Sequence, residues 1–530
     1  MSTTLDRAME VPAAPTPPPR QRSPRALLAA GVVVAALALV PLGFVLTYTV
    51  IIGPSEAWSL IARPRVRTLL GNTVSLVVAC TITSSILGVA SAWVVERTDL
   101  PARRLWHGLL VAPLAIPAFV NSYSWSSLFT GVHGFTGALL VITLSYYPLV
   151  YLPVVAMLRG LDPALEETSL SLGHSRTTSF FRVVLPQLRP ALLGGGLLVS
   201  LHLLAEFGAL QMLQFPTFTT AIYDQYSSTF NGAAANMLAV VLVLACLVIL
   251  VGELRLRGHR RYSRVAHGAA RPAEPIALGR TAAPVALLLA GLVGLALGLP
   301  TYSLTHWLRV GSSTEFPLGD LAAAAGTSLG LGAAAAALTV LIAMPAAWLA
   351  VRYPGLASNL VERSTYIANA LPGIVVALAL VTVSIRVVQP IYQTLALLLL
   401  AYAIMFLPRA VVSVRAALEQ APIVLDQVSH SLGVGPISTA RRVTLPLIAP
   451  GIGAGAALVF LAVSTELTAT LMLAPIDTTT LATRFWSESS SVAYGAAAPY
   501  AILMVLISIP AAVLLGRHAT LSNLTSDVTR

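Results

Sequence analysis

The sequence predicts an all-α integral membrane protein with about twelve transmembrane helices in two parallel six-helix repeats. Three observations support this fold class: 56% of the 530 residues are hydrophobic and only 10% are charged, long uncharged runs recur, and one motif occurs twice. The mean hydropathy is +0.82, whereas soluble domains carry roughly 25% charged residues. Most of the chain is therefore expected to lie in lipid.

Each uncharged run of ~20 residues or more is long enough for a helix to cross a bilayer. The run over 105–158 is too long for one helix, and the glycine-containing segment 131–137 divides it into a hairpin of two spans. The predicted spans are centred near residues 40, 82, 117, 147, 200, 242, 290, 336, 374, 400, 457 and 505.

The first apolar run exceeds the length of a signal-peptide core, so we expect an uncleaved first helix. The Pro-, Ala- and Arg-rich segment before it is typical of a disordered tail. The predicted domains are a disordered cytosolic tail over 1–25, a first half over 26–252, a cytosolic linker over 253–280, a second half over 281–517, and a cytosolic tail over 518–530.

All 32 basic residues are arginine, and the net charge is +11. If the N-terminus is cytosolic, most arginines fall on the cytosolic side, in clusters that include 97–104, 255–280 and 409–442. The positive-inside rule explains this asymmetry and places both termini in the cytosol. The basic charge therefore reflects topology and gives no support to nucleic-acid binding. The exceptions on the outside are Arg63, Arg65, Arg67, Arg309, Arg386 and Arg484.

The sequence contains no nucleotide-binding loop and no cluster of metal-ligand residues. A phosphate-binding Walker loop needs lysine, which this chain does not contain, so another subunit must hydrolyse any ATP. Cys80 and Cys246 lie in apolar spans without metal-ligand spacing and are expected to be small core residues. We therefore expect a transport protein that is not an enzyme and binds no cofactor of its own. The lysine-free, alanine-rich composition is typical of a GC-rich bacterial genome, which indicates a bacterial inner or plasma membrane.

An internal repeat organises the chain. The pattern Glu167, Gly173, Leu185-Pro186 recurs 260 residues later as Gln427, Gly433, Leu445-Pro446. The same register is predicted to continue without a gap, so that Glu206 aligns with Glu466 and Thr219-Thr220 with Thr479-Thr480. Because each copy holds an even number of spans, the two halves point the same way, and a transport path is expected at their interface. Upstream the offset is 255, matching Gly71, Ala92-Trp93 and Arg97 to Gly326, Ala347-Trp348 and Arg352.

The repeated motif predicts a compact cytosolic loop in each half. Acidic residues after Pro163 favour the start of a helix over 165–172, and Gly173 permits a sharp turn. A second short helix over 177–184 is expected to end at Leu185-Pro186, before the next span. The second copy repeats this plan with Asp426, Gly433 and Pro446.

The segments 165–173 and 425–433, with their trailing Leu-Pro pairs, resemble the Glu-Ala-Ala loop of binding-protein-dependent ABC importer permeases. The resemblance implies a type I ABC importer permease fold. It makes 163–186 and 422–446 the coupling helices that dock on two copies of a separate ABC ATPase, and it implies an extracytoplasmic solute-binding protein. Thr168-Ser169 and Val428-Ser429 stand in place of the two alanines, which would let the two docking sites differ in strength. The residues assigned to coupling are Glu166, Glu167, Gly173, Leu185, Pro186, Asp426, Gln427, Gly433, Leu445 and Pro446.

A more specific resemblance indicates the solute. Five short segments are similar to the ferric-iron branch of these permeases, which has fused halves, and the thiamine permeases are similar and also fused. Ferric iron is therefore the expected solute, with thiamine or another small solute as the alternative. The segments are 113–119, 145–151, 205–208, 216–220 and 481–484.

Glu206 and Glu466 are the candidate residues of the translocation path. Each lies about sixteen residues beyond the cytosolic end of its span, ~24 Å along a helix. Charges at that depth usually face a cavity or a partner, and carboxylate oxygens suit a hard, highly charged ion. The alternative is that both glutamates lie at the outer interface or cap a helix break, and any metal ligands are unknown.

Neighbouring side chains have simpler interpretations. His202 is expected to be a core histidine, while Tyr146, Tyr147 and Tyr151 fit an interfacial aromatic belt better than a set of phenolate ligands. The outer loops 214–232 and 474–494 are either a docking surface for the binding protein or plain connections. A proton-driven secondary transporter working through Glu206 and Glu466 is the main rival function, and a membrane-embedded enzyme is the third.

Overall fold

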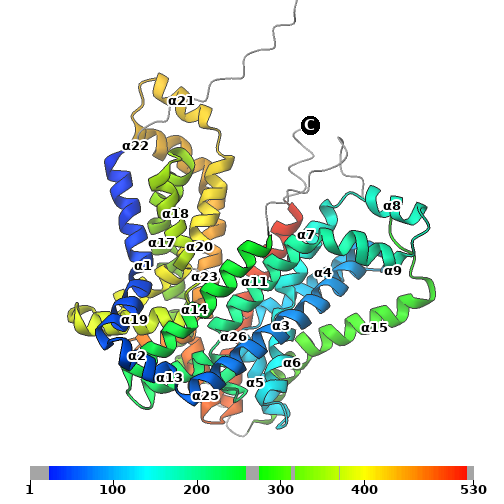
Figure 1. Ribbon diagram of the computed structural model, residues 1–530, viewed down its shortest axis with the longest axis horizontal. Helices are drawn as coiled ribbons and strands as arrows, with labels where there is room; N and C mark the ends of the chain where they lie inside the picture. Colours follow the sequence, from blue (N-terminus) through cyan, green and yellow to red (C-terminus); the bar gives the residue numbers. More distant parts are fainter. Residues whose placement is uncertain (1–22, 258–273, 312–316, 369, 522–530) are drawn as a thin grey trace, which may run out of the picture.

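The computed structural model describes residues 23–257, 274–311, 317–368 and 370–521, which are almost entirely helical (Figure 1). Much of the predicted tails and linker therefore lies outside the described residues. Eight described helices are long and apolar enough to cross a membrane, or eleven if each of three bent pairs is one span. The predicted number of twelve is not confirmed, because the last apolar segment, Tyr494–Pro510, is shorter. The chain is a multi-pass membrane protein.

The first half carries a long helix near its start and a cluster of short helices at its loop. Its elements are α1 (Arg25–Ile52), α2 (Pro54–Ile61), α3 (Pro64–Arg97), α4 (Arg103–Val111), η1 (Ala112–Ala115), α5 (Ala118–Leu128), α6 (Gly134–Tyr146), α7 (Pro148–Gly160), α8 (Ala164–Ser171), α9 (Arg176–Ser179), η2 (Phe180–Val184), α10 (Leu185–Gln187), α11 (Arg189–Ala205), α12 (Gly208–Met212), α13 (Phe218–Ser227) and α14 (Gly232–Arg257).

The second half repeats this order. Its elements are η3 (Gly279–Thr281), α15 (Ala282–Val293), η4 (Gly294–Gly298), α16 (Leu299–Val310), α17 (Leu318–Arg352), α18 (Leu356–Ala368), α19 (Gly373–Arg386), η5 (Gln389–Ile391), α20 (Leu395–Gln420), α21 (Ile423–Ser431), α22 (Pro436–Thr439), η6 (Ala440–Thr444), α23 (Leu445–Ser464), α24 (Thr468–Leu473), α25 (Leu481–Ser490) and α26 (Tyr494–Leu521).

Three mutually packed helices form the centre of each half: α3, α7 and α11 in the first, and α17, α20 and α23 in the second. Small residues permit the close approach. A Cβ atom on Gly195 of α11 would lie 2.8 Å from the Cα of Val150 of α7. In the second half, a Cβ on the equivalent Gly455 would lie 2.8 Å from the Cβ of Ser413.

The first helix of each half packs against the other half. Helix α1 packs on α17 and α18, while α16 packs on α5 of the first half. Figure 1 shows α1 beside α17 and α18, and α15 running along the opposite flank. Gly31 lets α1 come close, since a Cβ there would lie 2.3 Å from the end of the Leu349 side chain.

Equivalent prolines break one membrane segment in each half. Pro117 and Pro372 are both extended, with ψ angles of 140° and 143°. The helices on either side are bent by 89° in the first half and 103° in the second. Proline lacks the N–H for an intrahelical hydrogen bond and disfavours helical backbone before it, which explains both breaks.

Candidate translocation site and paired loops

The two predicted loops have the same backbone design. Gly173 and Gly433 have φ angles of +86° and +78°. The Gly433 N–H donates to the His430 carbonyl, and the Val434 N–H donates to the Ser429 carbonyl. The first copy has both equivalent bonds, so each loop helix ends in a Schellman motif. The predicted glycine turns are confirmed.

A buried hydroxyl pair joins the two short helices of each loop. Ser169 Oγ lies 2.8 Å from Ser179 Oγ, and Ser429 Oγ lies 2.8 Å from Thr439 Oγ1 at the equivalent place. Ser169 and Ser429 therefore have a structural role at positions where the resembling family has alanine.

The predicted end of the second short helix is wrong for the second copy. A π-helical turn, η2 or η6, precedes each Leu-Pro pair. The Leu445 N–H then bonds the Ala440 carbonyl five residues back. Because this shifted register accommodates the missing N–H of Pro446, the segment Pro436–Ser464 continues as one span. In the first copy the chain bends by 66° between Arg176–Gln187 and Arg189–Ala205, beyond Pro186.

The other assigned loop residues take equivalent positions in the two copies. Glu167 and Gln427 are exposed, Leu185 and Leu445 are partly buried, and Pro186 and Pro446 are exposed. Glu166 and Asp426 instead face the long helices: Glu166 lies 3.8 Å from Arg97 and Asp426 lies 3.2 Å from Arg352.

Each loop also exposes apolar side chains away from the membrane-spanning segments. Leu172 is 73% exposed and its equivalent Leu432 is 76% exposed. Leu165, Phe181, Leu425, Val428 and Ile437 are exposed as well. Exposed apolar patches of this kind mark interaction surfaces. Figure 1 shows α8 and α9 on one side of the molecule and α21 and α22 on the other, at the same end; we call this the loop end.

Glu206 and Glu466 each cap a helix break, as the alternative interpretation expected. Glu206 Oε1 accepts a hydrogen bond from the Ala209 N–H at 3.0 Å, and Glu466 Oε1 accepts one from the Ala469 N–H at 3.0 Å. The two carboxylates also interact electrostatically across the two halves. Gly208, two residues after Glu206, contacts the second half next to Glu466, since a Cβ there would lie 2.9 Å from a methyl carbon of Leu467. Both carboxylates therefore lie at the interface of the halves.

The second oxygen of each carboxylate has different surroundings. Tyr146 donates a 2.6 Å hydrogen bond to Glu206 Oε2. Arg409 interacts electrostatically with Glu466 and with His202. The equivalent positions in the other half hold Phe406 and Leu149, so the two halves are chemically unequal here.

These contacts correct two sequence predictions. Arg409 lies in the middle of α20, inside a candidate span, and not in a cytosolic cluster. Tyr147 and Tyr151 are fully buried and Tyr146 contacts Glu206, so these tyrosines do not form an interfacial belt. His202 Nδ1 lies 2.8 Å from the Leu198 carbonyl oxygen, a local partner.

No group of three or more His, Cys, Asp or Glu side chains converges on one point in the part of the chain that is described. The carboxylate pair could attract a hard cation but could not enclose one as a closed ligand set.

Aromatic contacts join the halves at the end opposite the loops. Phe119 lies 5.5 Å and Tyr123 lies 5.2 Å from Phe485 between ring centroids. Phe207 lies 5.3 Å from Trp486. We call Phe119, Tyr123, Phe207, Phe485 and Trp486 the aromatic contact.

The sequence predicted that the two halves align at a spacing of 260 residues without a gap. Helices α13 and α25, at the same end, show that this alignment is wrong there. Their capping boxes use Thr217 with Thr220, and Thr480 with Thr483. Thr217 is therefore equivalent to Thr480, three residues beyond the predicted register. Two of these residues lengthen the turn between α24 and α25 relative to the turn between α12 and α13, and the third lengthens α24 relative to α12.

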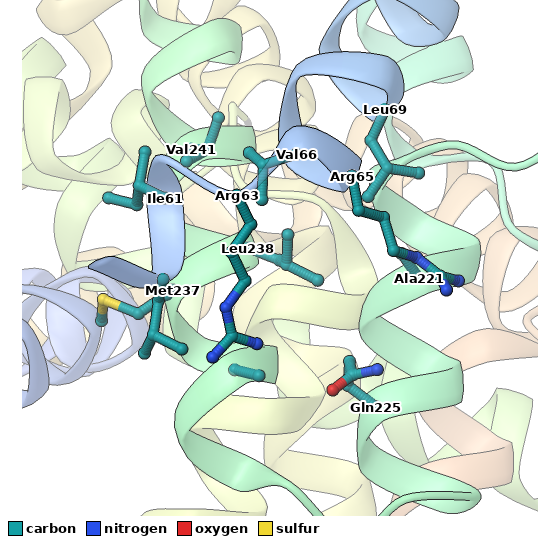
Figure 2. A pocket seen from close by; sticks show the side chains of 12 residues that line it. Ile61, Arg63, Arg65, Val66, Leu69, Ala221, Gln225, Met237, Leu238 and Val241 are labelled. Carbon is teal, nitrogen blue, oxygen red and sulfur yellow. The ribbon is translucent and has the colours of Figure 1, made fainter. Parts of the chain in front are cut away.

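Figure 2 shows a pocket formed by first-half elements alone, with Arg63 and Arg65 among apolar side chains that include Leu238 and Val241. Burial raises the pKa of the nearby Asp224, and Arg65 opposes this change. Glu206 and Glu466 are not among the residues that line the pocket, so the pocket is not the candidate site.

Comparison with known families defines the class. A family model described as the binding-protein-dependent transport system inner membrane component matches residues 84–256 and 339–519. The chain belongs to this family and carries its domain twice. It is therefore a transport permease, and the secondary-transporter and enzyme alternatives are not supported.

Two relatives refine the comparison. The chain is 39% identical over 473 residues to the Fe(3+)-transport system permease protein FbpB 2 of Haemophilus influenzae, covering 88% of this chain and 93% of the relative. It is 30% identical over 251 residues to the sulfate transport system permease protein CysT of Escherichia coli, covering 43% of this chain and 90% of the relative. The sulfate relative thus corresponds to a single half.

Proposed function

We propose that this chain is the complete membrane path of an ATP-driven importer for ferric iron. The observation that carries the solute assignment is the end-to-end similarity to a Fe(3+)-transport permease, at 39% identity over 93% of that relative. The carboxylate site supports a cationic solute, because Glu206 and Glu466 bring carboxyl oxygens to the interface of the halves, and hard cations prefer oxygen ligands.

Energy would come from two separate ATPase subunits that dock on the loop end, which we place in the cytosol together with both termini. The exposed Leu172 and Leu432 support this docking, since they occupy equivalent positions in the two loops. ATP binding would draw the two loops together, and hydrolysis would release them. A solute-binding protein would dock at the opposite end, on the surface that includes α13 and α25.

The structure corresponds to an inward-open state in this proposal. The aromatic contact holds the halves together at the outer end, while the two loops lie on opposite sides of the molecule (Figure 1). Ferric iron would enter between Phe207 and Trp486 after these rings separate, and would then pass Glu206 and Glu466.

A competition experiment tests the solute. Proteoliposomes that contain this chain, its ATPase and its binding protein should import labelled ferric iron, and excess thiamine or sulfate should leave the rate unchanged. Inhibition by thiamine together with import of labelled thiamine would transfer the assignment to the alternative solute.

A further inference from the structure

Two buried ion pairs connect the loops to the long helices, and neither arginine has an assigned role. Arg97 is the last residue of α3, and Arg352 is the last residue of α17. Their side chains are 4% and 8% exposed, and their partners Glu166 and Asp426 are 16% and 18% exposed. The two pairs occupy equivalent positions in the internal repeat.

We propose that Arg97 and Arg352 are positioning residues of the transport cycle: each fixes its loop to the end of a long helix, so that loop movement displaces the whole half. This inference rests on the proposed coupling of the loops to an ATPase.

The chain path explains why a second attachment is needed. Each loop continues directly into the helix that ends at a path carboxylate, α11 before Glu206 and α23 before Glu466. Helices α3 and α17 pack on α11 and α23 but are separated from the loops by two other spans in sequence. Without a direct contact, a pull on the loop would reach α11 and could let it slide against α3. The ion pair joins loop and long helix at the same level.

We call each attachment of a loop to its long helix a joint: the first joint contains Arg97 and Glu166, and the second contains Arg352 and Asp426. The two joints share the ion pair and differ in their other contacts. In the first half, Trp93 of α3 packs edge-on against Phe180 of η2, with centroids 4.7 Å apart, and Arg97 lies over the Trp93 ring. In the second half, Asp426 also accepts a 2.8 Å hydrogen bond from Thr444, and Arg352 donates to the Ala421 carbonyl. The charge pair is therefore the common element of both joints.

The first joint is the looser one. Its N–O separation is 3.8 Å against 3.2 Å in the second. Among the described residues, two guanidinium nitrogens of Arg97, Nε and Nη2, are buried without a hydrogen-bond partner, against one nitrogen, Nε, of Arg352. Val184 occupies the position of Thr444, so Glu166 has no equivalent of that hydroxyl bond. The backbone beside Arg97 is instead held by the segment before α15, because Ile276 donates to the Arg97 carbonyl at 2.8 Å.

The test uses the full transporter in proteoliposomes and measures ATP hydrolysed per ferric ion imported. The neutral double variant Arg97→Gln/Arg352→Gln should still assemble with the ATPase and hydrolyse ATP, while the ratio rises at least tenfold. The exchanged variant, Arg97→Glu with Glu166→Arg and Arg352→Asp with Asp426→Arg, should bring the ratio back toward that of the wild type.

Arg159→Gln is the matched control. Arg159 pairs at 2.6 Å near the same end with Glu96, which belongs to α3 and not to the loop. Its loss should leave the ratio unchanged. An unchanged ratio in the neutral variant, a failure of the exchanged variant to restore it, or an equal rise in the control would overturn the proposal. Should the double variant not assemble, Arg97→Gln alone must raise the ratio.

A measurement without iron separates this inference from the solute assignment. Spin labels on Leu172→Cys and Leu432→Cys report the loop separation, and labels on Phe230→Cys and Ile476→Cys report the opposite end; the native Cys80 and Cys246 are buried. With ATP bound, the wild type should change both distances. The neutral variant should bring the loops together while the opposite end stays unchanged. Linked movement at both ends in that variant would contradict the proposal, whatever the solute.

Discussion

Glu206 and Glu466 combine two roles that are usually separate. One oxygen of each accepts a backbone N–H at a helix break, and the carboxylates also interact across the interface of the halves. The capping role alone would require only an acceptor, which an amide oxygen supplies equally well. The negative charge is the property that capping leaves unexplained, and substitution by glutamine separates the two roles.

Glu206→Gln/Glu466→Gln should keep both helix caps and lower the rate of ferric uptake at least tenfold. A tenfold decrease corresponds to a loss of about 1.4 kcal/mol in the stabilisation of the ion. The reconstituted uptake rate is the measurement, with ATPase assembly as the check on folding. Glu419→Gln is the control, because Glu419 is 51% exposed and pairs with Arg415 on the same helix. Uptake at the wild-type rate in the double variant would remove the carboxylates from the path.

Gly173→Ala should loosen the first loop by about 1 kcal/mol, because a side chain is disfavoured at its positive φ. Amide hydrogen exchange over 165–174 should then quicken about fivefold. Gly160→Ala is the matched control: both sites have open space for a Cβ atom, and only Gly173 has positive φ. Equal exchange in the two variants would show that the positive φ of Gly173 does not hold the turn.

For single residues, the sequence predicted the features that depend on local backbone conformation, but few of the contacts that depend on residues distant in the chain. Gly173 and Gly433 were identifiable because a glycine directly after a short helix is typical of a left-handed turn, and here it occurs in both copies. The contact of Tyr146 with Glu206 was not, because nothing in the spacing shows that α6 faces α11. Arg409 was misplaced because a charge count assigns arginines to loops, whereas this one is accommodated by Glu466 inside a span.

Among the elements, the broken helices distinguish this protein from a simple bundle. Pro117 and Pro372 divide one segment in each half, while Pro446 follows a π turn and leaves its helix continuous. Pro186 also follows a π turn, yet the chain bends by 66° just beyond it, so neither the position of a proline nor the preceding turn alone predicts where a helix ends. The breaks at Pro117 and Pro372 and the bend beyond Pro186 leave eight long helices among the described residues, where eleven spans would otherwise be counted.

Helix packing in the first half should be intolerant of added volume at Gly195. In Gly195→Ala the new Cβ would meet backbone, the Cα of Val150, at 2.8 Å. We expect a loss of about 1–3 kcal/mol in the free energy of unfolding. Denaturant unfolding of the purified chain in detergent measures it. Gly453→Ala in α23 is the control, with no atom within 4 Å of its Cβ, and should be neutral or stabilising. An unchanged stability in Gly195→Ala would refute the close approach of α7 and α11.

For the whole molecule, the first helix of each half packs against the opposite half, and this packing makes the two halves interdependent. Hydropathy identified α1 as a span, and the repeat placed it in the first half, but neither indicates which helices it contacts. Lateral packing in a membrane depends on small residues and surface shape, so Gly31 is informative only once Leu349 is known to face it.

The packing of α1 on α17 and α18 of the second half predicts a specific cross-link. A Cβ atom at residue 31 would lie 3.5 Å from a methyl carbon of Val361, so Gly31→Cys/Val361→Cys should form a disulfide on mild oxidation. After cleavage at a protease site introduced between 258 and 273, the two fragments should migrate together on a non-reducing gel. Gly43→Cys/Val361→Cys should not cross-link, since a Cβ at Gly43 has no atom within 4 Å. Separate fragments in the first variant would place α1 elsewhere.

Uptake of labelled ferric iron, with and without ATP, tests whether this chain is a coupled importer. The vesicles contain the chain, its ATPase and its binding protein, and are compared with vesicles that carry the loop variant Gly173→Asp/Gly433→Asp. We predict uptake that requires ATP and falls to background in the variant, because both loops lose the turn that shapes their docking surface. Hydrolysis stimulated by the binding protein without iron movement would contradict the solute assignment alone. Iron uptake that proceeds without ATP would contradict ATP-driven import by this chain.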